Sequence, residues 1–186
     1  MHEALEKGIT PKIIFDQVRS VRDQLSIGLV AMVSVSIVIA MGGPDEFAKQ
    51  ASNAGFDGSI FPDLPLAESD AYHAACKAHG LTMTLLIAPT SPDDRVAEIA
   101  NASTGFTYLL ARSGVTGAQS DVPDISERVR TIRAKSRTPI ACGFGISTAD
   151  HVSKIVEHAD GAIVGSALVK RILQAHQRQL DYAVEA

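Results

Sequence analysis

The sequence predicts an α/β protein with a parallel sheet, either six of the eight strands of a (β/α)8-type barrel or an open parallel doubly wound sheet. Short apolar segments alternate with helix-like segments, and this cycle occurs six times after an initial helix. The apolar segments are hydrophobic nearly throughout. Such strands, when they alternate with helices, are typical of a parallel sheet that is buried on both faces.

The composition is that of an ordinary globular protein. Hydrophobic residues make up 46% and charged residues 20% of the 186 residues, and the net charge is −4. Since one domain usually has about 50–250 residues, we expect a single domain over residues 1–186. The basic residues are densest between Arg128 and Arg137, with the spacing of a solvated helix face, and tryptophan is absent. We therefore expect no nucleic-acid partner.

The stretch between Asp23 and Asp45 carries no charge. It is long enough for a membrane helix, which needs about 20 apolar residues. However, it contains serines and glycines, and its centre is rich in β-branched residues, as in a buried strand. We therefore expect no membrane partner.

The first half of the chain contains three predicted helices. Thr10 and Pro11 suit the N-cap and first position of the first helix. A second helix begins near Pro44 and ends before Gly55, and a third ends at Gly80, where a left-handed cap is favoured. The residues of the first helix expected to point inward are Ile13, Ile14, Val18 and Val21. Strands are predicted at residues 27–33, 58–61 and 81–87.

The second half repeats the pattern. Ser91, Pro92 and the following acids form a helix start, and Ser147 is the predicted cap of a later helix. Cys76 and Cys142 are interpreted as buried small hydrophobes of a protein in a reducing cytoplasm. Strands are predicted at residues 106–110, 138–142 and 161–164, and helices at about 91–101, 125–136, 147–156 and 167–182.

Glycines follow the last two predicted strands, in G-F-G-I-S (residues 143–147) and G-S-A (residues 165–167), and each group leads into a helix. Glycine lets backbone N–H groups approach an anion, and helix N-termini favour negative charge. Barrels often bind phosphate after their last two strands. The pattern favours a small-molecule phosphate ligand, with tight turns as the alternative.

Other candidates follow earlier strands. The loop at residues 111–123 is long enough for a lid, in which Gly117 could donate to the same phosphate, or it is a plain surface connection. Asp63 either contacts a ligand or partner or forms a turn. Tyr108 either projects into the mouth of the sheet or packs in the core, and Phe144 could cover an apolar ring. None of the histidines follows a strand, so no metal is expected.

Four segments, F-D-G-S-I-F-P-D-L-P, F-T-Y-L-L-A-R-S-G-V-T-G, G-F-G-I-S and A-I-V-G-S-A-L-V-K, occur in this order. Together they closely resemble the tryptophan synthase α-subunit family, over about residues 8–171. The resemblance implies a TIM (β/α)8 barrel that cleaves indole-3-glycerol phosphate to indole and glyceraldehyde 3-phosphate. It implies no cofactor in this chain, since pyridoxal phosphate belongs to the β-subunit that would be its partner.

The resemblance also assigns roles to individual residues. Arg112 and Thr116 would belong to the mobile loop, and Asp63 matches the aspartate of a family element. The residues implied to bind the substrate phosphate are Gly117, Gly145, Gly165 and Ser166. The residues implied to line the indole pocket are Ile60, Leu86, Tyr108, Phe144 and Ile163.

Two departures from the family qualify the expected activity. The sequence is N-terminally truncated relative to the family and lacks its first two strands, which carry the catalytic acids, so no catalytic residue is assigned. Val35 stands where a pocket tyrosine is expected. We therefore expect weak or absent cleavage by this chain alone, with a non-catalytic phosphate-binding or β-subunit-binding module as the alternative. Open strand edges also predict self-association.

Overall fold

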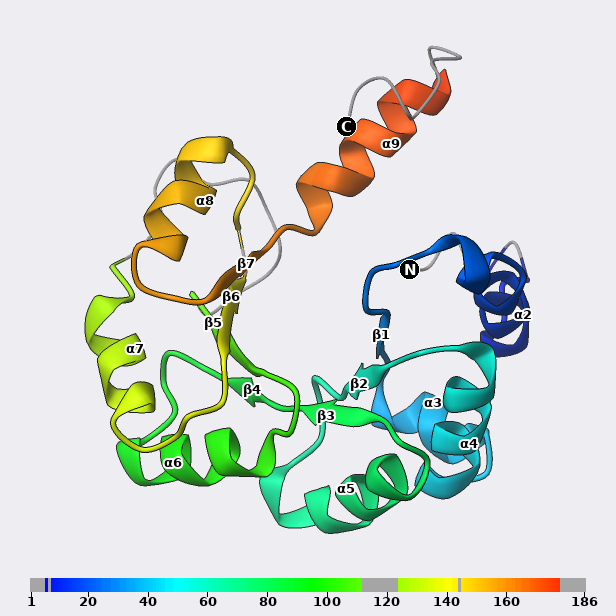
Figure 1. Cartoon of the computed structure of the whole chain (residues 1–186), viewed down its shortest axis with the longest axis horizontal. Helices are drawn as coiled ribbons and strands as arrows, with labels where there is room; N and C mark the ends of the chain where they lie inside the picture. Colours follow the sequence, from blue (N-terminus) through cyan, green and yellow to red (C-terminus); the bar gives the residue numbers. More distant parts are fainter. Residues whose placement is uncertain (1–5, 7, 112–123, 144, 178–186) are drawn as a thin grey trace. The chain divides into compact units, whose positions relative to one another are not determined.

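The computed structural model describes residues 6, 8–111, 124–143 and 145–177. The chain forms two compact units, Met1–Leu85 with Ala102–Gly105, and Leu86–Asn101 with Phe106–Ala186. Each unit has its own parallel sheet with helices between successive strands (Figure 1). The predicted alternation of strands and helices is therefore confirmed.

The first unit contains a three-stranded sheet in the order β1-β2-β3. Both strand pairs are parallel, and they place Met32 beside Ile60 and Ile60 beside Thr84. Its elements are α2 (Pro11–Val21), η1 (Arg22–Gln24), β1 (Val30–Met32), α3 (Val35–Ala40), α4 (Pro44–Ala54), β2 (Gly58–Ile60), η2 (Leu66–Glu68), α5 (Ser69–Ala78) and β3 (Thr82–Thr84).

A chain of aromatic rings forms the core of this unit. Phe47 lies 6.0 Å from Phe15 and 5.8 Å from Phe61 between ring centroids, and Phe61 lies 5.0 Å from Tyr72. All four are buried. The prediction that Ile13, Ile14 and Val21 point inward from the first helix is wrong, because Phe15 occupies the core, whereas Val18 is half-buried. Ile13, Ile14 and Val21 are 42%, 48% and 39% exposed.

Helix α3 lies in the uncharged stretch that was interpreted as strand. Strand β1 ends at Met32, and the chain turns into α3 after Ser34. The carboxylate of Asp63 accepts a hydrogen bond from the N–H of Val35, at 3.0 Å, and so satisfies a donor of the first turn. This hydrogen bond to Asp63, which lies in another segment, stabilises a helix where the β-branched composition favoured a strand.

The predicted caps of the first half are confirmed. The hydroxyl of Thr10 accepts a hydrogen bond from Ile13 N, and Pro11 begins α2. Helix α4 ends at Gly55, with φ 96°, and Gly80 after α5 has φ 73°. Both glycines adopt the left-handed conformation that other residues rarely tolerate.

The strand predicted at residues 81–87 is divided into β3, which belongs to the first sheet, and β4 (Leu86–Ile87), which belongs to the second. Side-chain hydroxyls interrupt the backbone pairing. Met83 N donates to Thr104 Oγ1 at 2.8 Å, and Leu85 N donates to Ser103 Oγ at 3.1 Å. Because these donors bond to side chains, the ladder breaks before β4.

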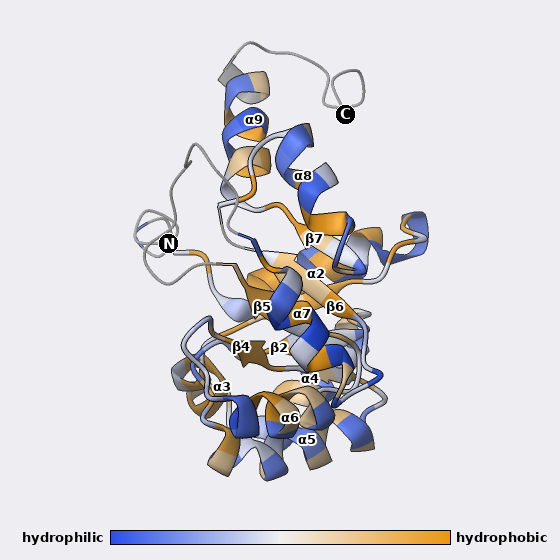
Figure 2. Cartoon of the chain, turned by 90° about the vertical axis from the view of Figure 1, so that its left-hand side faces the viewer, coloured by the Kyte–Doolittle hydropathy of each residue, from blue (hydrophilic) through white to orange (hydrophobic). Residues whose placement is uncertain are grey.

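The second unit contains a four-stranded parallel sheet in the order β4-β5-β6-β7. Its strands are hydrophobic, whereas α7 and α8 also carry hydrophilic residues (Figure 2). After β4, its elements are α6 (Asp93–Ala102), β5 (Thr107–Leu110), α7 (Ser126–Arg133), β6 (Ile140–Gly143), α8 (Ala149–Val156), β7 (Gly161–Ile163) and α9 (Ser166–Gln177).

Two helix caps of this unit differ from the prediction. Thr148, and not Ser147, caps α8, because its hydroxyl accepts a hydrogen bond from His151 N. Helix α6 begins at Asp93, and Ser91 Oγ accepts a hydrogen bond from Ala88 N at 3.1 Å. The predicted helix beyond residue 177 lies outside the described residues.

Both cysteines are free and buried, as predicted. Burial raises the pKa of Cys76 to about 11 and that of Cys142 to about 12, so both thiols stay protonated at neutral pH. Within the described part of the chain, no helix has the length and apolar character needed to cross a membrane.

Candidate functional site

The sheet of the second unit has two different faces. One face carries Ile87, Leu109 and Cys142, which share a register row and are almost completely buried. They belong to the core cluster that also includes Val96 of α6 and Val129 of α7. This face is therefore the packing layer under the helices, and a ligand would have to approach the opposite face.

The opposite face carries three residues of the predicted indole pocket. Leu86 is the register partner of Tyr108, and Tyr108 is in turn the partner of Ala141 in β6. Ile163 is the partner of Gly143, which lies two residues after Ala141 in the same strand. Since side chains alternate along a strand, Leu86, Tyr108 and Ile163 share one face. Tyr108 is buried, and the other two are half-buried.

The ring of Tyr108 lies over Gly143. A Cβ atom built at Gly143 would be only 2.4 Å from the Tyr108 hydroxyl oxygen and 2.6 Å from its Cε2. The glycine therefore makes room for the ring, which extends along the sheet toward the carboxyl end of β6. Burial, and secondarily the neighbouring Cys142, raises the pKa of Tyr108, so its hydroxyl remains a hydrogen-bond donor at neutral pH.

The predicted phosphate-binding residues that the structure describes follow β6 and β7. Gly145 is half-buried and has φ 82°, whereas Gly165 and Ser166 are exposed and precede or begin α9. The carbonyl of Gly165 accepts the N–H groups of Leu168 and Val169, at 3.0 and 3.2 Å. The N–H groups of the residues before Leu168 lie at the start of α9, where no carbonyl group one turn earlier can accept them. They are therefore the donors that an anion would use.

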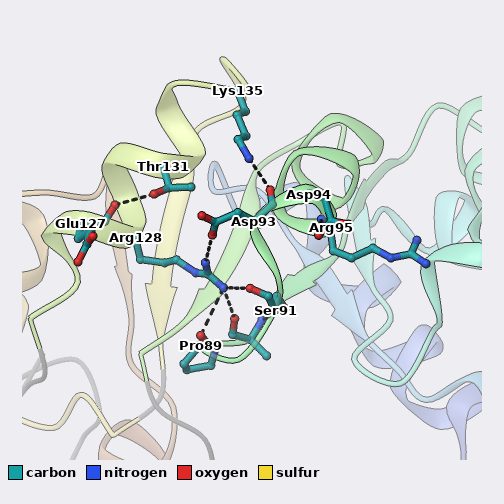
Figure 3. Close-up of polar contacts among 10 residues, drawn as sticks. Pro89, Ser91, Asp93, Asp94, Arg95, Glu127, Arg128, Thr131 and Lys135 are labelled. Carbon is teal, nitrogen blue, oxygen red and sulfur yellow. Dashed lines mark hydrogen bonds and ion pairs between the residues drawn. The ribbon is translucent and has the colours of Figure 1, made fainter.

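An arginine holds the loop that follows β4. Arg128 of α7 forms an ion pair with Asp93, at 2.9 Å, and donates to the carbonyl oxygens of Ala88 and Pro89, each at 3.3 Å, and to that of Ser91 (Figure 3). Its side chain is only 20% exposed. One side chain thus binds three carbonyl groups of the loop at the carboxyl end of β4.

This contact corrects the interpretation of the basic helix as a solvated face. Lys135 also turns toward the α6 start, where its ammonium group donates to the carbonyl oxygen of Asp93 at 2.5 Å (Figure 3). Sequence reasoning missed Arg128, since one arginine among several basic residues gives no signal of its own.

Two predicted site residues belong to the first unit. Ile60 is buried and shares a register row with Met32 and Thr84. Asp63 has a structural contact, the hydrogen bond from Val35 N at the start of α3. This contact gives Asp63 a helix-capping role, which neither the ligand interpretation nor the turn interpretation included.

Four other predicted residues, Arg112, Thr116, Gly117 and Phe144, lie outside the described residues. Their roles in the loop, the phosphate site and the indole pocket stay predictions. Among the residues that the structure describes, no group of three or more histidine, cysteine, aspartate or glutamate side chains is placed to hold a metal ion.

Comparison with known proteins gives consistent matches. The model of the family "Tryptophan synthase alpha chain" matches residues 1–185. The tryptophan synthase alpha chain of Opitutus terrae is 44% identical over 170 residues, which cover 91% of this chain and 64% of that protein. The corresponding protein of Methanocaldococcus jannaschii is 38% identical, over 93% of this chain and 62% of its own length. The chain thus spans less than two thirds of these relatives.

Solved structures of tryptophan synthase also match this chain. A structure of the tryptophan synthase a2b2 complex from Pyrococcus furiosus matches 93% of this chain and 70% of its own chain, with a TM-score of 0.85 and 31% identity. Tryptophan synthase from Mycobacterium tuberculosis matches 92% of this chain and 65% of its own, with a TM-score of 0.83 and 34% identity. These matches confirm the predicted fold class, an incomplete TIM-barrel type.

Proposed function

Because this chain belongs to the tryptophan synthase alpha chain family, we propose that it serves tryptophan biosynthesis by binding indole-3-glycerol phosphate, the substrate of a lyase reaction. The observation that carries the proposal is the arrangement of the second sheet. Leu86, Tyr108 and Ile163 form an apolar face that leads to the glycines after β6 and β7. An apolar surface beside free amides suits an indole ring joined to a phosphate.

In this proposal the phosphate is bound by backbone amides at Gly145, Gly165 and Ser166, helped by the positive end of α9. The indole ring packs against Tyr108 and Ile163. The buried hydroxyl of Tyr108 remains protonated, and Arg128 keeps the β4 loop in place at the edge of the site. No cofactor is required for these binding roles.

Aldol cleavage of indole-3-glycerol phosphate needs a proton for the indole carbon and a base for the glycerol hydroxyl. Positioned acid and base groups each contribute about 10²–10⁴-fold to such reactions. The family acids have no counterpart in these 186 residues, and Asp63 is engaged in capping α3. We therefore propose that this chain alone binds the substrate but cleaves it weakly or not at all.

Gly165 offers a direct test of phosphate binding. A Cβ atom at Gly165 would meet nothing within 4 Å, so Gly165→Ala keeps the fold while its methyl group obstructs the approach of an anion. Calorimetric titration with glycerol phosphate should show at least a tenfold weaker affinity for this variant. Gly161→Ala is the matched control, because its Cβ would meet only Ala141, at an ordinary 3.9 Å. Equal affinity in the two variants would contradict the site.

The alternative function, a non-catalytic module that binds a tryptophan synthase β-subunit, is favoured by the match to an a2b2 complex. Two assays separate the functions. Release of glyceraldehyde 3-phosphate from indole-3-glycerol phosphate, followed with a coupled dehydrogenase, reports cleavage. Stimulation of tryptophan formation from added indole and serine by a β-subunit, with no such release, would support the module.

A further inference from the structure

The side chain of His151 binds the turn that joins β6 to α8. His151 lies in the first turn of α8 and is only 6% exposed, although the two residues before it are exposed. Its ring nitrogen Nδ1 accepts a hydrogen bond from Ser147 N at 3.4 Å. Its own backbone N–H donates to the hydroxyl of Thr148, the N-cap of the helix, at 3.2 Å. One buried residue thus contacts the turn through both its side chain and its backbone.

This pair of hydrogen bonds is a variant of the capping box. In a capping box, the residue three positions after the N-cap donates its backbone N–H to the cap side chain, and its own side chain accepts the N–H of the cap residue. His151 stands at this position, but its ring accepts the N–H one residue earlier, that of Ser147. The contact therefore reaches beyond the helix into the turn that carries Gly145.

The turn is held on the side that follows Gly145. Gly145 has φ 82°, a conformation that residues with a side chain rarely adopt. The next residue, Ile146, is 4% exposed and belongs to the core cluster of the second unit. Ser147 is then held by His151. Because these two anchors restrict the backbone rotations next to Gly145, they help to set the direction of its N–H group.

The hydrogen bond also defines what a substitute for His151 must supply. A backbone N–H can only donate, so Nδ1 must accept, and in the neutral ring the proton then lies on Nε2. Glutamine has an amide carbonyl that can accept the same N–H group, whereas leucine fills similar space without an acceptor. These two substitutions therefore separate the hydrogen bond from the packing of the side chain.

We propose that His151 is a positioning residue for anion binding, which acts through Ser147 to keep the N–H of Gly145 directed at a bound phosphate. This inference rests on the proposed function, in which Gly145 donates to the substrate phosphate. In this role His151 does not contact the phosphate itself. A turn that already has its binding conformation loses less conformational freedom when the ligand arrives. Removal of the acceptor should therefore weaken phosphate binding.

The test compares three variants of the chain by calorimetric titration with glycerol phosphate. His151→Leu should bind about tenfold more weakly, since it loses one hydrogen bond and the order that this bond gives to the turn. His151→Gln should stay within about twofold of the unmodified chain, since its carbonyl oxygen replaces Nδ1. Thr148→Ala is the matched control, because it removes the other hydrogen bond of His151 and weakens the same helix start but keeps the Ser147 contact. Its affinity should be close to that of the unmodified chain.

A second measurement needs no ligand. Hydrogen exchange followed by NMR should show that the Ser147 amide exchanges faster in His151→Leu than in the unmodified chain or in His151→Gln. Thr148→Ala should instead accelerate exchange of the His151 amide, which loses its acceptor. The two amides therefore report the two hydrogen bonds separately.

The outcomes distinguish this inference from the proposed function. Normal glycerol phosphate affinity in His151→Leu would overturn the inference alone, and so would an unchanged exchange rate of its Ser147 amide. An equal loss of affinity in His151→Gln or in Thr148→Ala would also overturn it, since the effect would then come from packing or helix stability. An unmodified chain that protects the Ser147 amide but has no affinity for glycerol phosphate would overturn the proposed function, and with it the binding role of His151.

Discussion

Both units contain the same three-part contact at the amino-terminal ends of their strands, but its arginine is less exposed in the first. There, Asp57 precedes β2 and accepts a hydrogen bond from Leu29 N, at 2.7 Å, just before the neighbouring β1. Arg22, which follows α2, binds both carboxylate oxygens of Asp57 at 3.2 and 3.0 Å and the carbonyl of Ile27 at 2.9 Å. The aspartate thus ties a strand to its neighbour and to a helix.

In the second unit, Asp160 precedes β7 and accepts a hydrogen bond from Ile140 N of β6, at 2.8 Å. Arg133, at the end of α7, binds Asp160 at 2.8 Å and the carbonyl of His158 at 3.2 Å. The Arg133 side chain is 47% exposed, against 26% for Arg22. The connections are equivalent, and the aspartates differ in the opposite direction, with Asp57 50% and Asp160 41% exposed. We expect the contact with the less exposed arginine to contribute more to stability.

The two contacts lie at the opposite strand ends from the proposed phosphate site. Both lie where strands begin, and they use charged side chains. The carboxyl ends of β6 and β7 instead carry glycines with accessible backbone amides. This division agrees with the general behaviour of β/α barrels, in which the carboxyl ends bind ligands and the opposite ends contribute stability.

The largest expected effect comes from Gly55→Ala. Gly55 has φ 96°, and its Cβ would lie 2.6 Å from Cγ of Arg22, so the substitution strains the backbone and displaces the arginine from Asp57. We expect the free energy of unfolding to fall by about 3 kcal/mol, of which the left-handed conformation accounts for about 1–2 kcal/mol. Urea unfolding followed by circular dichroism measures the change.

Gly80→Ala is the matched control for this variant. Gly80 also has positive φ, 73°, but its Cβ would meet nothing within 4 Å. The control isolates the backbone strain, so the difference between the two variants reports the Arg22 contact. Equal losses would mean that Arg22 adds nothing measurable at this position.

A smaller effect separates the two aspartates. Asp57→Ala leaves the N–H of Leu29 and a partly covered guanidinium without their partner, and we expect a loss of about 2 kcal/mol. Asp160→Ala should cost about 1 kcal/mol, because Arg133 is better solvated. Asp23→Ala, in η1, is the surface control. A larger loss for Asp160→Ala than for Asp57→Ala would reverse our ranking of the two contacts.

The features that the sequence predicted correctly are those determined by neighbouring residues. Thr10, Gly55 and Gly80 mark helix ends because the backbone itself requires an acceptor or a left-handed conformation there. The prediction that the isoleucines of α2 point inward was wrong, since the choice between Phe15 and the adjacent isoleucines depends on Phe47 in another helix.

Contacts distant in sequence explain the other differences. The division of residues 81–87 depends on hydroxyls at Ser103 and Thr104, about twenty residues later. For the site, the strand ends and glycines were evident, but the choice between core and mouth for Tyr108 required the register with β6. The structure places it opposite the core cluster, over Gly143.

The smallest expected effect is a difference in acid sensitivity. The hydrogen bond from Ile140 N, and next the contact with Arg133, lowers the pKa of Asp160 in the folded state. A carboxylate with a lowered folded pKa stabilises the fold above its unfolded pKa, near 3.9, and this contribution is lost as the pH falls through the folded value. Asp160→Asn should therefore unfold with a shallower dependence on pH below about 4.

The measurement is the free energy of unfolding in urea at a series of pH values from neutral to acidic. The variant is expected to be less stable than the unmodified chain at neutral pH, and the two curves should converge in acid as Asp160 becomes protonated. Asp70→Asn, which changes an aspartate of α5 in the other unit, is the control for the loss of one carboxylate. If the Asp160→Asn curve ran parallel to that of the unmodified chain down to the lowest pH, the hydrogen bond to Ile140 N would not couple protonation to folding.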